Sequence, residues 1–445
     1  MAGVHGSYFR ERCVGNRPLG IRSMSNRVHI VGAGVAGLHC AAVLRSNGVR
    51  VAVYEKSDAV GGRMRTDQVG GFLLDRGFHV MQSGYECAGS RVDFGSLGAR
   101  PFRSGVRVIR LAGGTPEVLT YADPFRSPLA ALGSLRNGNW FDLLRVGALR
   151  WRLVHQDVNA SFSSGDASTH RYLRELGFSQ DFLKRFFCPL LAGIFLESRL
   201  ATSERMFRFV FQAMARGKML LPRAGIKAVP ERIADFVGRE HIRLGVPARA
   251  IDSRRVLIGD RVEDAAQIIV AHPTVGASDS RSVWTLHFDA EHSPAPGGYL
   301  LLNGDYELGK NAIAHLAVPS DVQPCYGADG RALVTVTVVG DAAQALGLVE
   351  PGAVADRVRY ELGAWFPQSV NWRILAVQNV SGALPVREAG SGLKADTPAT
   401  SSEILSCGDH CLHGSVEGAL RSAEAAAIEC LNRLGIEPAP ITHTY

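Results

Sequence analysis

The chain has 445 residues, of which 46% are hydrophobic and 20% charged, a balance typical of globular proteins with a large core. At about 150 residues per domain, this length predicts two or three lobes. The net charge of +7 does not indicate nucleic-acid binding, because the basic residues are scattered and no basic run is interleaved with aromatic side chains. No apolar run approaches the roughly 18 residues that cross a bilayer, so we expect no transmembrane segment.

The first 27 residues contain five arginines and one acidic residue and show little hydrophobic pattern. We expect residues 1–27 to form a flexible extension. Because transit peptides are basic and poor in acids, an organellar targeting signal is the alternative, and a cytoplasmic location is otherwise expected. The eight cysteines show no C-x-x-C spacing, which predicts free thiols in a reducing compartment and no metal site.

After the extension, the chain opens with a β-α-β pattern. A strand, a helix and a second strand are predicted over residues 28–31, 35–46 and 49–55. The pair Asn47-Gly48 is typical of a helix end. A unit of about 30 residues with this order is the expected size of a dinucleotide-binding βαβ motif.

The turn between the first strand and the helix carries glycines in G-x-G-x-x-G spacing. The first glycine permits a tight turn, the second lets the backbone approach a pyrophosphate, and the third lets the helix pack on the strand. Glu55, at the end of the second strand, would accept hydrogen bonds from ribose hydroxyls, and its charge disfavours NADP. The βαβ unit alone does not decide whether the bound dinucleotide is NAD or FAD. Its expected cofactor contacts are Gly32, Ala33, Gly34, Ala36, Gly37, Glu55 and Lys56.

The middle of the chain alternates between two kinds of pattern. Residues 113–135 are turn-rich, and residues 143–221 are mostly helical in periodicity. Within them, residues 203–221 form a helical stripe rich in Met, Phe and Arg, which favours packed core over a helix that dips into a membrane. The later patterns are a mixed helix and strand region, a strand-rich region and a closing helix, over residues 226–273, 286–339 and 415–434.

Two further motifs identify the dinucleotide. From Glu55 the sequence reads E-K-x(4)-G-G-R-x-R-T, and near the C-terminus G-D is followed by S-x-E-G-A. Asp409 at a strand end can bind a ribityl hydroxyl, and the N-terminus of the helix after Ser415 can face the electron-rich edge of a flavin ring. Jointly, from residue 28 onward, the sequence resembles the superfamily of flavin-containing amine oxidases and phytoene desaturase-like FAD-dependent oxidoreductases.

The resemblance implies an α/β fold. A Rossmann-type, glutathione-reductase-like FAD-binding domain, discontinuous in sequence, would carry an inserted α+β substrate domain. The FAD-binding domain is expected over residues 28–99, 223–274 and 385–445, and the substrate domain over residues 100–222 and 275–384. The sequence has no second glycine fingerprint for NADPH, so glutathione-reductase-like chemistry is not expected.

The resemblance also implies the remaining FAD contacts. They belong to a loop near the pyrophosphate and ribityl chain, a loop at the flavin ring, two segments near the adenine, and the closing segment beside the ribityl chain and the ring. In that order, they are Gly61, Gly62 and Arg63; Gly77, Phe78 and His79; Ala248 and Ala271; and Gly408, Asp409, Ser415, Val416 and Ala419. Asp75 and Arg76 are interpreted as a loop ion pair. For His79 and His410, a structural role is favoured over a role in a proton relay.

The expected function is that of an FAD-dependent oxidoreductase. Many amine oxidases have a lysine of the substrate domain near flavin N5, but here only Lys310, in a polar loop, lies between residues 274 and 384. We therefore expect hydride transfer from a C–H bond of a small, apolar or isoprenoid-like substrate to flavin N5, with an amine as the alternative substrate. Oxygen or a quinone would be the electron acceptor, and no catalytic residue is assigned.

Two other classes of function remain open. One is a redox-neutral flavin isomerase or an NAD-linked dehydrogenase, which would keep the site and change the reaction. The other is a non-enzymatic escort-type binding protein of the same fold, against which the intact Gly61-Gly62-Arg63 and Asp409 argue. Peripheral contact with a membrane is compatible with each class.

Overall fold

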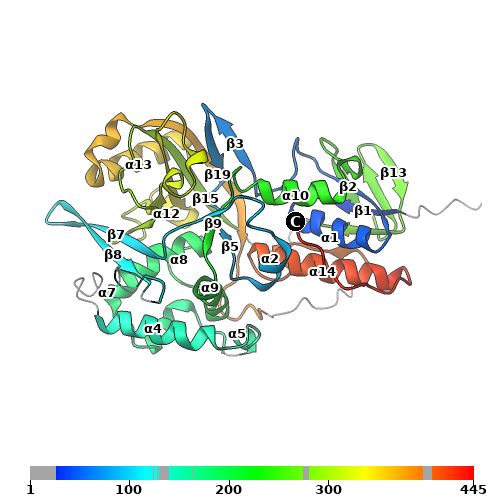
Figure 1. Cartoon of the computed structure of the whole chain (residues 1–445), viewed down its shortest axis with the longest axis horizontal. Coiled ribbons are helices and arrows are strands. Elements are labelled where there is room, and N and C mark those ends of the chain that lie inside the picture. The colour runs from blue at the N-terminus through cyan, green and yellow to red at the C-terminus, as the bar shows by residue number, and fades with distance from the viewer. Residues whose placement is uncertain are drawn as a thin grey trace, which may run out of the picture.

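The structure is a computed structural model that describes residues 27–123, 125–127, 129, 140–163, 165–273, 280–393 and 403–445. The predicted extension at residues 1–27 therefore lies outside the described residues, except that Arg27 already begins the first strand. Two large sheets lie in different halves of the molecule, with the chain crossing several times between them (Figure 1).

The first sheet has five parallel strands in the order β10-β2-β1-β14-β20. In that order they are Ile242–Arg243, Arg50–Tyr54, Arg27–Val31, Gln267–Val270 and Leu405–Ser406. Because the strands of a parallel sheet are covered on both faces, they are almost continuously apolar, and β1 and β2 are buried along nearly their whole length. The predicted β-α-β unit and the α/β fold class are confirmed.

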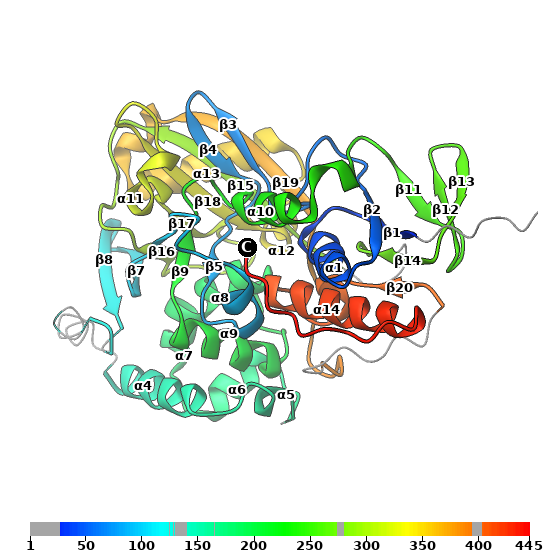
Figure 2. The same ribbon diagram turned by 45° about the vertical axis from the view of Figure 1, so that its right-hand side comes forward.

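Helices cover one face of this sheet, and a small sheet covers the other. Helix α1 (Val35–Ser46) packs against both α10 (Ala228–Val237) and α14 (Val416–Arg433), as Figure 2 shows. It ends at the predicted Asn47-Gly48, where Gly48 takes a positive φ of 77°. Neighbouring residues of a strand point to opposite faces, so the other face of β1 and β14 packs on three antiparallel strands. These are β11 (Ala248–Ala250), β12 (Arg255–Ile258) and β13 (Arg261–Asp264).

The second sheet has seven strands in the order β19-β15-β18-β17-β16-β7-β8, and only β16 and β7 pair in parallel. In that order they are Arg373–Pro385, Ser280–Ala290, Ala332–Val339, Ile313–Ala317, Leu300–Asn303, Gly105–Ala112 and Thr115–Ala122. One face packs on α13 (Pro351–Trp365) through a core that includes Leu286, Phe288 and Val336. Except for Arg27 and Pro385, the strands of each sheet fall within one predicted domain. The boundaries themselves stay a prediction.

The other side of the second sheet carries a group of helices with a phenylalanine-rich core. They are α4 (Trp140–Val154), α5 (Ala160–Ser163), α6 (Thr169–Glu175), α7 (Gln180–Phe182), a π-helical turn (Leu183–Phe187), α8 (Cys188–Phe195) and α9 (Glu204–Arg216). In α9 the stripe that includes Phe207, Phe209 and Val210 is buried, which confirms that it is core. No described helix is long and apolar enough to cross a bilayer.

Two sequence-based element predictions were wrong in part. The turn-rich segment at residues 113–135 contains strand β8, because Gly113-Gly114, with positive φ angles, form the two-residue turn that connects β7 to β8 as a hairpin. The helix predicted through residue 221 ends at Arg216. The chain then forms β9 (Met219–Leu221), which pairs with β5 and β6, so sheet pairing replaces the helical pattern.

The remaining elements are short. The hairpin of β3 and β4 leads into the predicted flavin-ring loop, and α2 precedes the helical group. In chain order they are β3 (Thr66–Val69), β4 (Phe72–Asp75), β5 (Met81–Gln82), α2 (Glu86–Arg91), β6 (Arg100–Pro101), α11 (Pro319–Val322) and α12 (Gly340–Ala345). Single 3₁₀ turns occur at Arg239–His241, Pro324–Tyr326, Pro367–Asn371 and Asp409–Cys411.

Candidate functional site

A cavity of about 650 Å³ lies at the carboxyl edge of the five-stranded sheet. The loops that follow β1, β2 and β14 meet there with the ends of β15 and β19 and with the 3₁₀ turn that follows β20. Its lining residues are Val31, Gly32, Tyr54, Glu55, Lys56, Arg63, Pro247, Ala248, Arg249, His272, Pro273, Ser280, Gly382, Pro385, Asp409 and His410. Open α/β sheets bind ligands outside the carboxyl ends of their strands, so this cavity is the candidate site.

The glycine turn has the geometry that its spacing predicts. Gly32 has a φ of 109° and donates from its amide to the carbonyl oxygen of Tyr54 at 2.8 Å. At Gly37 an added Cβ would lie 2.0 Å from the oxygen of Gly32 and 2.9 Å from the Cβ of Ala271. At Gly34 an added Cβ would meet no atom within 4 Å, and no side chain caps the helix that begins there. The N-terminus of α1 is therefore left open to a ligand.

Glu55 is bound into this turn as well as lining the cavity. Its Oε2 atom accepts a hydrogen bond from the amide of Ala33 at 2.9 Å. Its Oε1 atom accepts from the amide and the hydroxyl of Ser57 at 2.9 and 2.8 Å. Lys56 follows on the cavity wall with an exposed side chain. The carboxylate thus fixes the glycine turn and places a negative charge at the end of β2.

The loop after β2 lies directly against the glycine turn. The amide of Gly61 donates to the carbonyl of Ala33 at 2.9 Å, and Gly61 forms an isolated parallel bridge with Gly34. A Cβ at Gly62 would stand 3.4 Å from the Cα of Gly34. A Cβ at Gly61 would lie 2.5 Å from the Met64 oxygen, and both glycines have a positive φ, of 109° and 58°, which suits glycine. The loop places the next residue, Arg63, at the cavity.

Arg63 connects this loop to the closing segment of the chain. Its guanidinium donates to the carbonyl of Ala383 at 2.7 Å and forms an ion pair with Asp409 at 2.5 Å. Asp409 is buried, whereas the Arg63 side chain is 40% exposed. Beside them, Arg387 donates to the carbonyl of His410, and burial lowers the pKa of His410. Two residues that lie 346 positions apart therefore share one wall of the cavity.

The predicted flavin-ring loop does not line this cavity. Phe78 packs edge-on against Phe102 and His315, with ring centroids 6.0 and 5.4 Å apart. His79 hydrogen-bonds the carbonyl of Arg76 at 2.9 Å, and burial lowers its pKa. Gly77 has a φ of 103°, which suits glycine at this bend. The loop lies between the hairpin β3–β4 and the seven-stranded sheet.

The ion pair predicted between Asp75 and Arg76 does not form. Asp75 is buried and accepts hydrogen bonds from Thr66 at 2.6 Å and Tyr326 at 2.7 Å. Arg76 instead pairs with Asp67 at 2.7 Å. Adjacent residues at the end of a strand point to opposite sides, so their side chains are separated. Burial raises the pKa of Asp75, although its hydrogen bonds oppose that effect.

The closing motif has structural contacts of its own. Ser415 caps α14 by accepting from the amide of Gly418 at 3.0 Å, and the amide of Gly408 donates to Ser422. Glu417 is fully buried and accepts from two backbone amides at the start of α2. The other two predicted contacts, Val416 and Ala419, pack against the core of the parallel-sheet half and do not line the cavity.

A second polar feature lies in the seven-stranded sheet. Thr337 pairs in register with Thr285 on one side and His315 on the other, so the three side chains share one face. Both threonines are buried, and their hydroxyls have no hydrogen-bond partner among the described residues. On the same face, His287 hydrogen-bonds the carbonyl of Asp75 at 3.1 Å. This face of the sheet therefore opposes the segment that leads to Phe78.

Sequence reasoning missed more than half of the cavity wall, ten of its 16 residues. Tyr54 and His272 follow the rule that ligands meet the carboxyl ends of parallel strands, so their strand-end positions gave a usable signal. Ser280 and Gly382 come from the other sheet and had none, because only the tertiary arrangement brings them here. The missed lining residues other than His410 are Val31, Tyr54, Pro247, Arg249, His272, Pro273, Ser280, Gly382 and Pro385.

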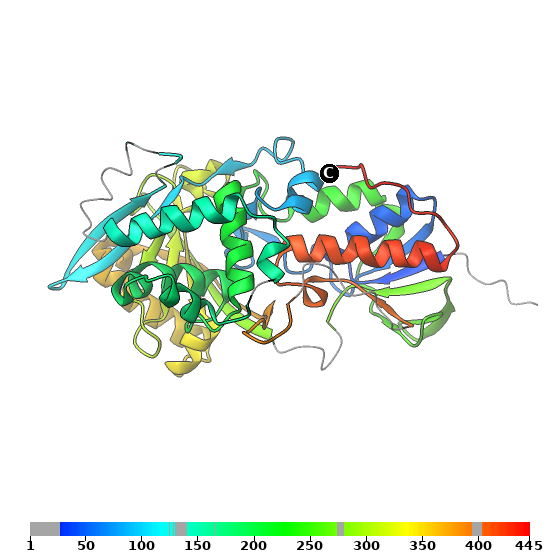
Figure 3. The same cartoon turned by 90° about the horizontal axis from the view of Figure 1, so that it is seen from below.

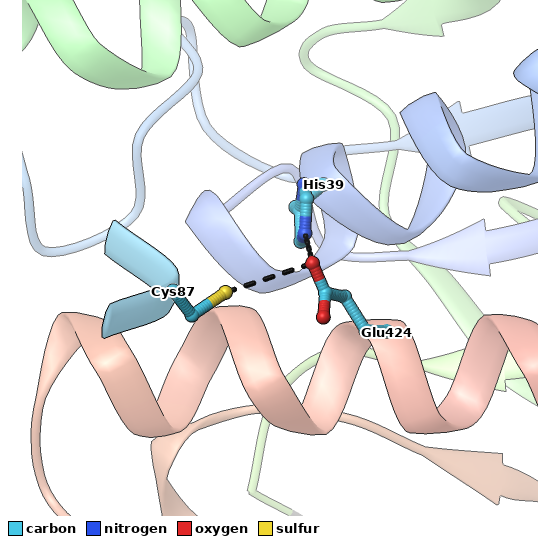
Figure 4. Close-up of side chains that lie close together, drawn as sticks. All are labelled: His39, Cys87 and Glu424. Atoms are coloured by element: carbon cyan, nitrogen blue, oxygen red, sulfur yellow. Dashed lines mark hydrogen bonds and ion pairs between the residues drawn. The ribbon is translucent and has the colours of Figure 1, made fainter. Parts of the chain in front are cut away.

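Three side chains with metal-ligating atoms also gather between α1, α2 and α14: His39, Cys87 and Glu424 (Figure 4). Arg91 donates to the same Glu424 oxygen that contacts His39, at 2.8 Å, and its positive charge opposes a cation. Burial alone would raise the pKa of Glu424, but hydrogen bonds from His39 and Arg91 hold it at about 2. His39 also contacts the Tyr445 hydroxyl at 2.6 Å. This cluster is a paired network that joins the helices.

Comparison with known proteins gives matches along most of the chain. A family model described as flavin containing amine oxidoreductase matches residues 35–296 and 313–431. Protoporphyrinogen oxidase 2, chloroplastic/mitochondrial, of Arabidopsis thaliana is 40% identical over 74 residues, which cover 17% of this chain and 14% of that protein. Hydroxysqualene dehydroxylase of Zymomonas mobilis subsp. mobilis is 44% identical over 62 residues, 14% of this chain and 15% of that protein.

These curated relatives are matched over about a seventh of their own length. Among solved structures, cyclohexylamine oxidase from Brevibacterium oxydans IH-35A is similar with a TM-score of 0.67 and 18% identity. The match covers 92% of this chain and 99% of that one. At this identity, the likeness shows a shared fold.

Proposed function

The chain belongs to the family of flavin-containing amine oxidoreductases, and on that premise we propose that it takes a hydride from a C–H bond of a small, apolar, isoprenoid-like substrate. Membership makes it an FAD-dependent oxidoreductase; the substrate and the transfer to flavin N5 are the proposal. One observation supports it above the others: residues from the glycine turn, the end of β2, the loop after β2 and the closing segment all line one cavity.

The residues of this cavity fit FAD. The open N-terminus of α1 and the space above Gly34 suit a pyrophosphate, because the helix dipole and free backbone amides favour negative charge. Glu55 and Asp409 are acceptors for the hydroxyls of a ribose and a ribityl chain. Arg63, Lys56 and Arg249 offset the negative charge of a dinucleotide. We propose that the other predicted contacts reach the flavin from the Phe78 loop and from the start of α14.

An apolar substrate is favoured over an amine because the only lysine between residues 274 and 384, Lys310, is poorly placed for catalysis. Lys310 is on the surface, with its side chain 70% exposed, and its Nζ atom pairs with Glu307 at 2.7 Å. The sheet face opposite the Phe78 loop instead presents the hydroxyls of Thr285 and Thr337. One curated relative is named for hydroxysqualene, an oxygenated isoprenoid, which agrees with a substrate that is mostly apolar and carries at most one oxygen function.

When bound, FAD supplies the redox chemistry by accepting the hydride at N5. The protein holds and orients the reactants and excludes water. In this proposal, Thr285 and Thr337 close the reaction side of the site and hydrogen-bond either the substrate oxygen or an ordered water. The buried contact between His287 and the carbonyl of Asp75 fixes that sheet face against the loop. The proton that leaves the substrate together with the hydride would pass to water, and no side chain is assigned as its acceptor.

Anaerobic reduction of the purified holoprotein tests the proposal. Isoprenoid alcohols and polyenes should bleach the flavin absorbance, whereas primary and secondary amines should leave it unchanged. Bleaching by amines alone would overturn the substrate class. A coloured protein that none of these compounds bleaches, but that isomerises one of them, would overturn net oxidation in favour of a redox-neutral reaction.

The electron acceptor is tested on the same preparation. After anaerobic bleaching, air, a soluble quinone and NAD are added separately, and the rate at which the flavin colour returns is recorded. We propose that oxygen or a quinone is the electron acceptor, so one of the two should restore the flavin colour at least as fast as the substrate bleached it. Recovery only with NAD would indicate an NAD-linked dehydrogenase.

A further inference from the structure

The solvent side of helix α4 carries an apolar stripe. Trp140, Phe141, Leu144 and Trp151 are 47%, 58%, 63% and 63% exposed. Residues 140, 144 and 151 are four and seven positions apart, so these side chains lie along one face of the helix. The opposite face, with the buried Leu149, packs toward α9. Figures 1 and 2 show α4 along the lower edge of the molecule, and Figure 3 views the molecule from that side, with α4 away from the parallel sheet.

Beside the stripe is a second cavity, of about 350 Å³, with a mainly apolar wall. It is bounded by α4, α9, the hairpin β7–β8 and the π-helical turn before α8. Its aromatic and methionine side chains include Phe102, Tyr121, Phe182, Phe186, Phe211 and Met214. Trp140 and Leu144 belong both to this wall and to the exposed stripe, so the cavity and the stripe are continuous.

The charges beside the stripe are mostly positive. Four of the five charged residues that line the cavity are basic: Arg103, Arg126, Arg150 and Lys218. The fifth, Asp123, lies 3.7 and 3.6 Å from the guanidinium groups of Arg126 and Arg150. Arg103 and Lys218 are exposed and form no ion pair with an acid among the described residues. The stripe therefore has a basic border.

We propose that α4 docks on the surface of an anionic lipid bilayer and that the cavity beside the stripe takes up an apolar chain from that bilayer. Tryptophans near both ends of a surface helix, about 16 Å apart at 1.5 Å per residue, suit the boundary between headgroups and acyl chains. An apolar face with basic flanks is the pattern of helices that lie in a membrane surface. Docking stands independently; uptake of the chain rests on the proposed apolar substrate.

A second copy of the chain fits this surface less well. In a two-fold dimer the same patch meets itself, so the basic borders around Arg103 and Lys218 would be brought together. A bilayer that contains anionic lipid attracts those side chains and also closes the mouth of the cavity. Each exposed cation near such a surface contributes to binding and does so less at high salt.

Vesicle flotation tests the docking. The full chain is mixed with phosphatidylcholine vesicles that contain or lack phosphatidylglycerol, and the bound fraction is measured. The wild type should float with the anionic vesicles and be released by added salt, and a combined Trp140→Ser, Leu144→Ser and Trp151→Ser variant should bind at least about tenfold more weakly. A combined Val349→Ser, Tyr360→Ser and Val370→Ser variant is the matched control, because those side chains are 72–76% exposed elsewhere. It should bind like the wild type.

Wild-type protein that stays unbound on both vesicles, or an α4 variant that binds as well as the wild type, would overturn the docking. So would sedimentation that shows a wild-type dimer and a monomeric α4 variant, because the stripe would then be a subunit interface. Flavin absorbance of each variant is the check that it is folded, and no outcome depends on catalytic activity.

Uptake of an apolar chain is tested with Gly147→Phe. Gly147 lines the cavity, and a Cβ there would meet no atom within 4 Å, so a phenyl ring can fill the space without a backbone clash. The wild type should bind the fluorescent fatty acid cis-parinaric acid, and the variant should bind it about tenfold more weakly while it still floats with anionic vesicles. Equal binding of the probe would refute the cavity assignment. Probe binding without substrate oxidation would refute the proposed function alone.

Discussion

Replacing the two unpartnered threonines with valine should stabilise the cofactor-free protein. Thr285 and Thr337 are buried and neither hydroxyl has a partner among the described residues. An unsatisfied buried hydroxyl costs about 1–3 kcal/mol, and valine has nearly the same shape and an equal or better preference for strands. We expect each single variant to raise the free energy of unfolding by about 1 kcal/mol. The double variant should gain less than the sum, because the two residues are in contact.

The neighbouring Thr335 provides the control. It lies on the same strand and face as Thr337, but its hydroxyl lies 3.2 Å from Nδ1 of His287. Thr335→Val removes that partner and should lower the free energy of unfolding by about 1 kcal/mol. Urea unfolding of the apoprotein, followed by tryptophan fluorescence, measures all three changes. Opposite signs for Thr335 and Thr337 are the expected result.

The same two substitutions should lower the rate of flavin reduction while they raise the free energy of unfolding. If the two hydroxyls contact the substrate oxygen or an ordered water, the variants that stabilise the protein should bleach more slowly with a hydroxylated substrate, by about tenfold for one lost hydrogen bond. Loss of more than about 1 kcal/mol of stability in the Thr285→Val or Thr337→Val apoprotein would refute the reasoning, because the hydroxyls would then have partners in the folded chain.

Three further results are expected. Gly37→Ala should abolish FAD retention on desalting, because the new Cβ would lie 2.0 Å from the oxygen of Gly32 and push the helix off the turn. Arg63→Met should raise the Kd for FAD at least about tenfold in a fluorescence titration, because Asp409 loses its ion pair at 2.5 Å and the site loses a positive charge. Glu424, with its pKa held at about 2 against an ordinary 4.5, stabilises the fold above pH 4.5, and this contribution is lost as the pH falls toward 2. Glu424→Gln should therefore cost about 2 kcal/mol at pH 7 in urea and much less at pH 3; equal costs at both pH values would contradict this linkage.

Local geometry explains which parts of the site could be predicted from the sequence. The glycine turn at Gly32 to Gly37 and the acid at Glu55 are defined within one βαβ unit, so spacing alone predicts their arrangement. The meeting of Arg63 with Asp409 depends on strand order, and only the resemblance to a family supplied it. Ser280 reaches the cavity because the seven-stranded sheet ends there, for which the sequence carries no local pattern.

The exposed stripe on α4 shows a different limit. Hydrophobic periodicity predicts a helix and an apolar face, but it is the same whether that face meets the core or the solvent. Residues 203–221 had the stronger pattern, and α9 there is core. The stripe that includes Leu144 and Trp151 had the weaker pattern and is exposed. Which helix buries its apolar face depends on how the helices pack together, and the sequence pattern of one helix does not contain that information.

The order of strands in the parallel sheet constrains how the protein is made. β20 (Leu405–Ser406) pairs with β14, and α14 (Val416–Arg433) packs on α1, so the first and last described elements belong to one half of the fold. During synthesis, the edge of β14 and one side of α1 stay uncovered until β20 and α14 have left the ribosome. Asp409 belongs to the same late segment, so the nucleotide can be enclosed only after that segment is made, and a ribosome that stalls before β20 releases a chain with a bare sheet edge.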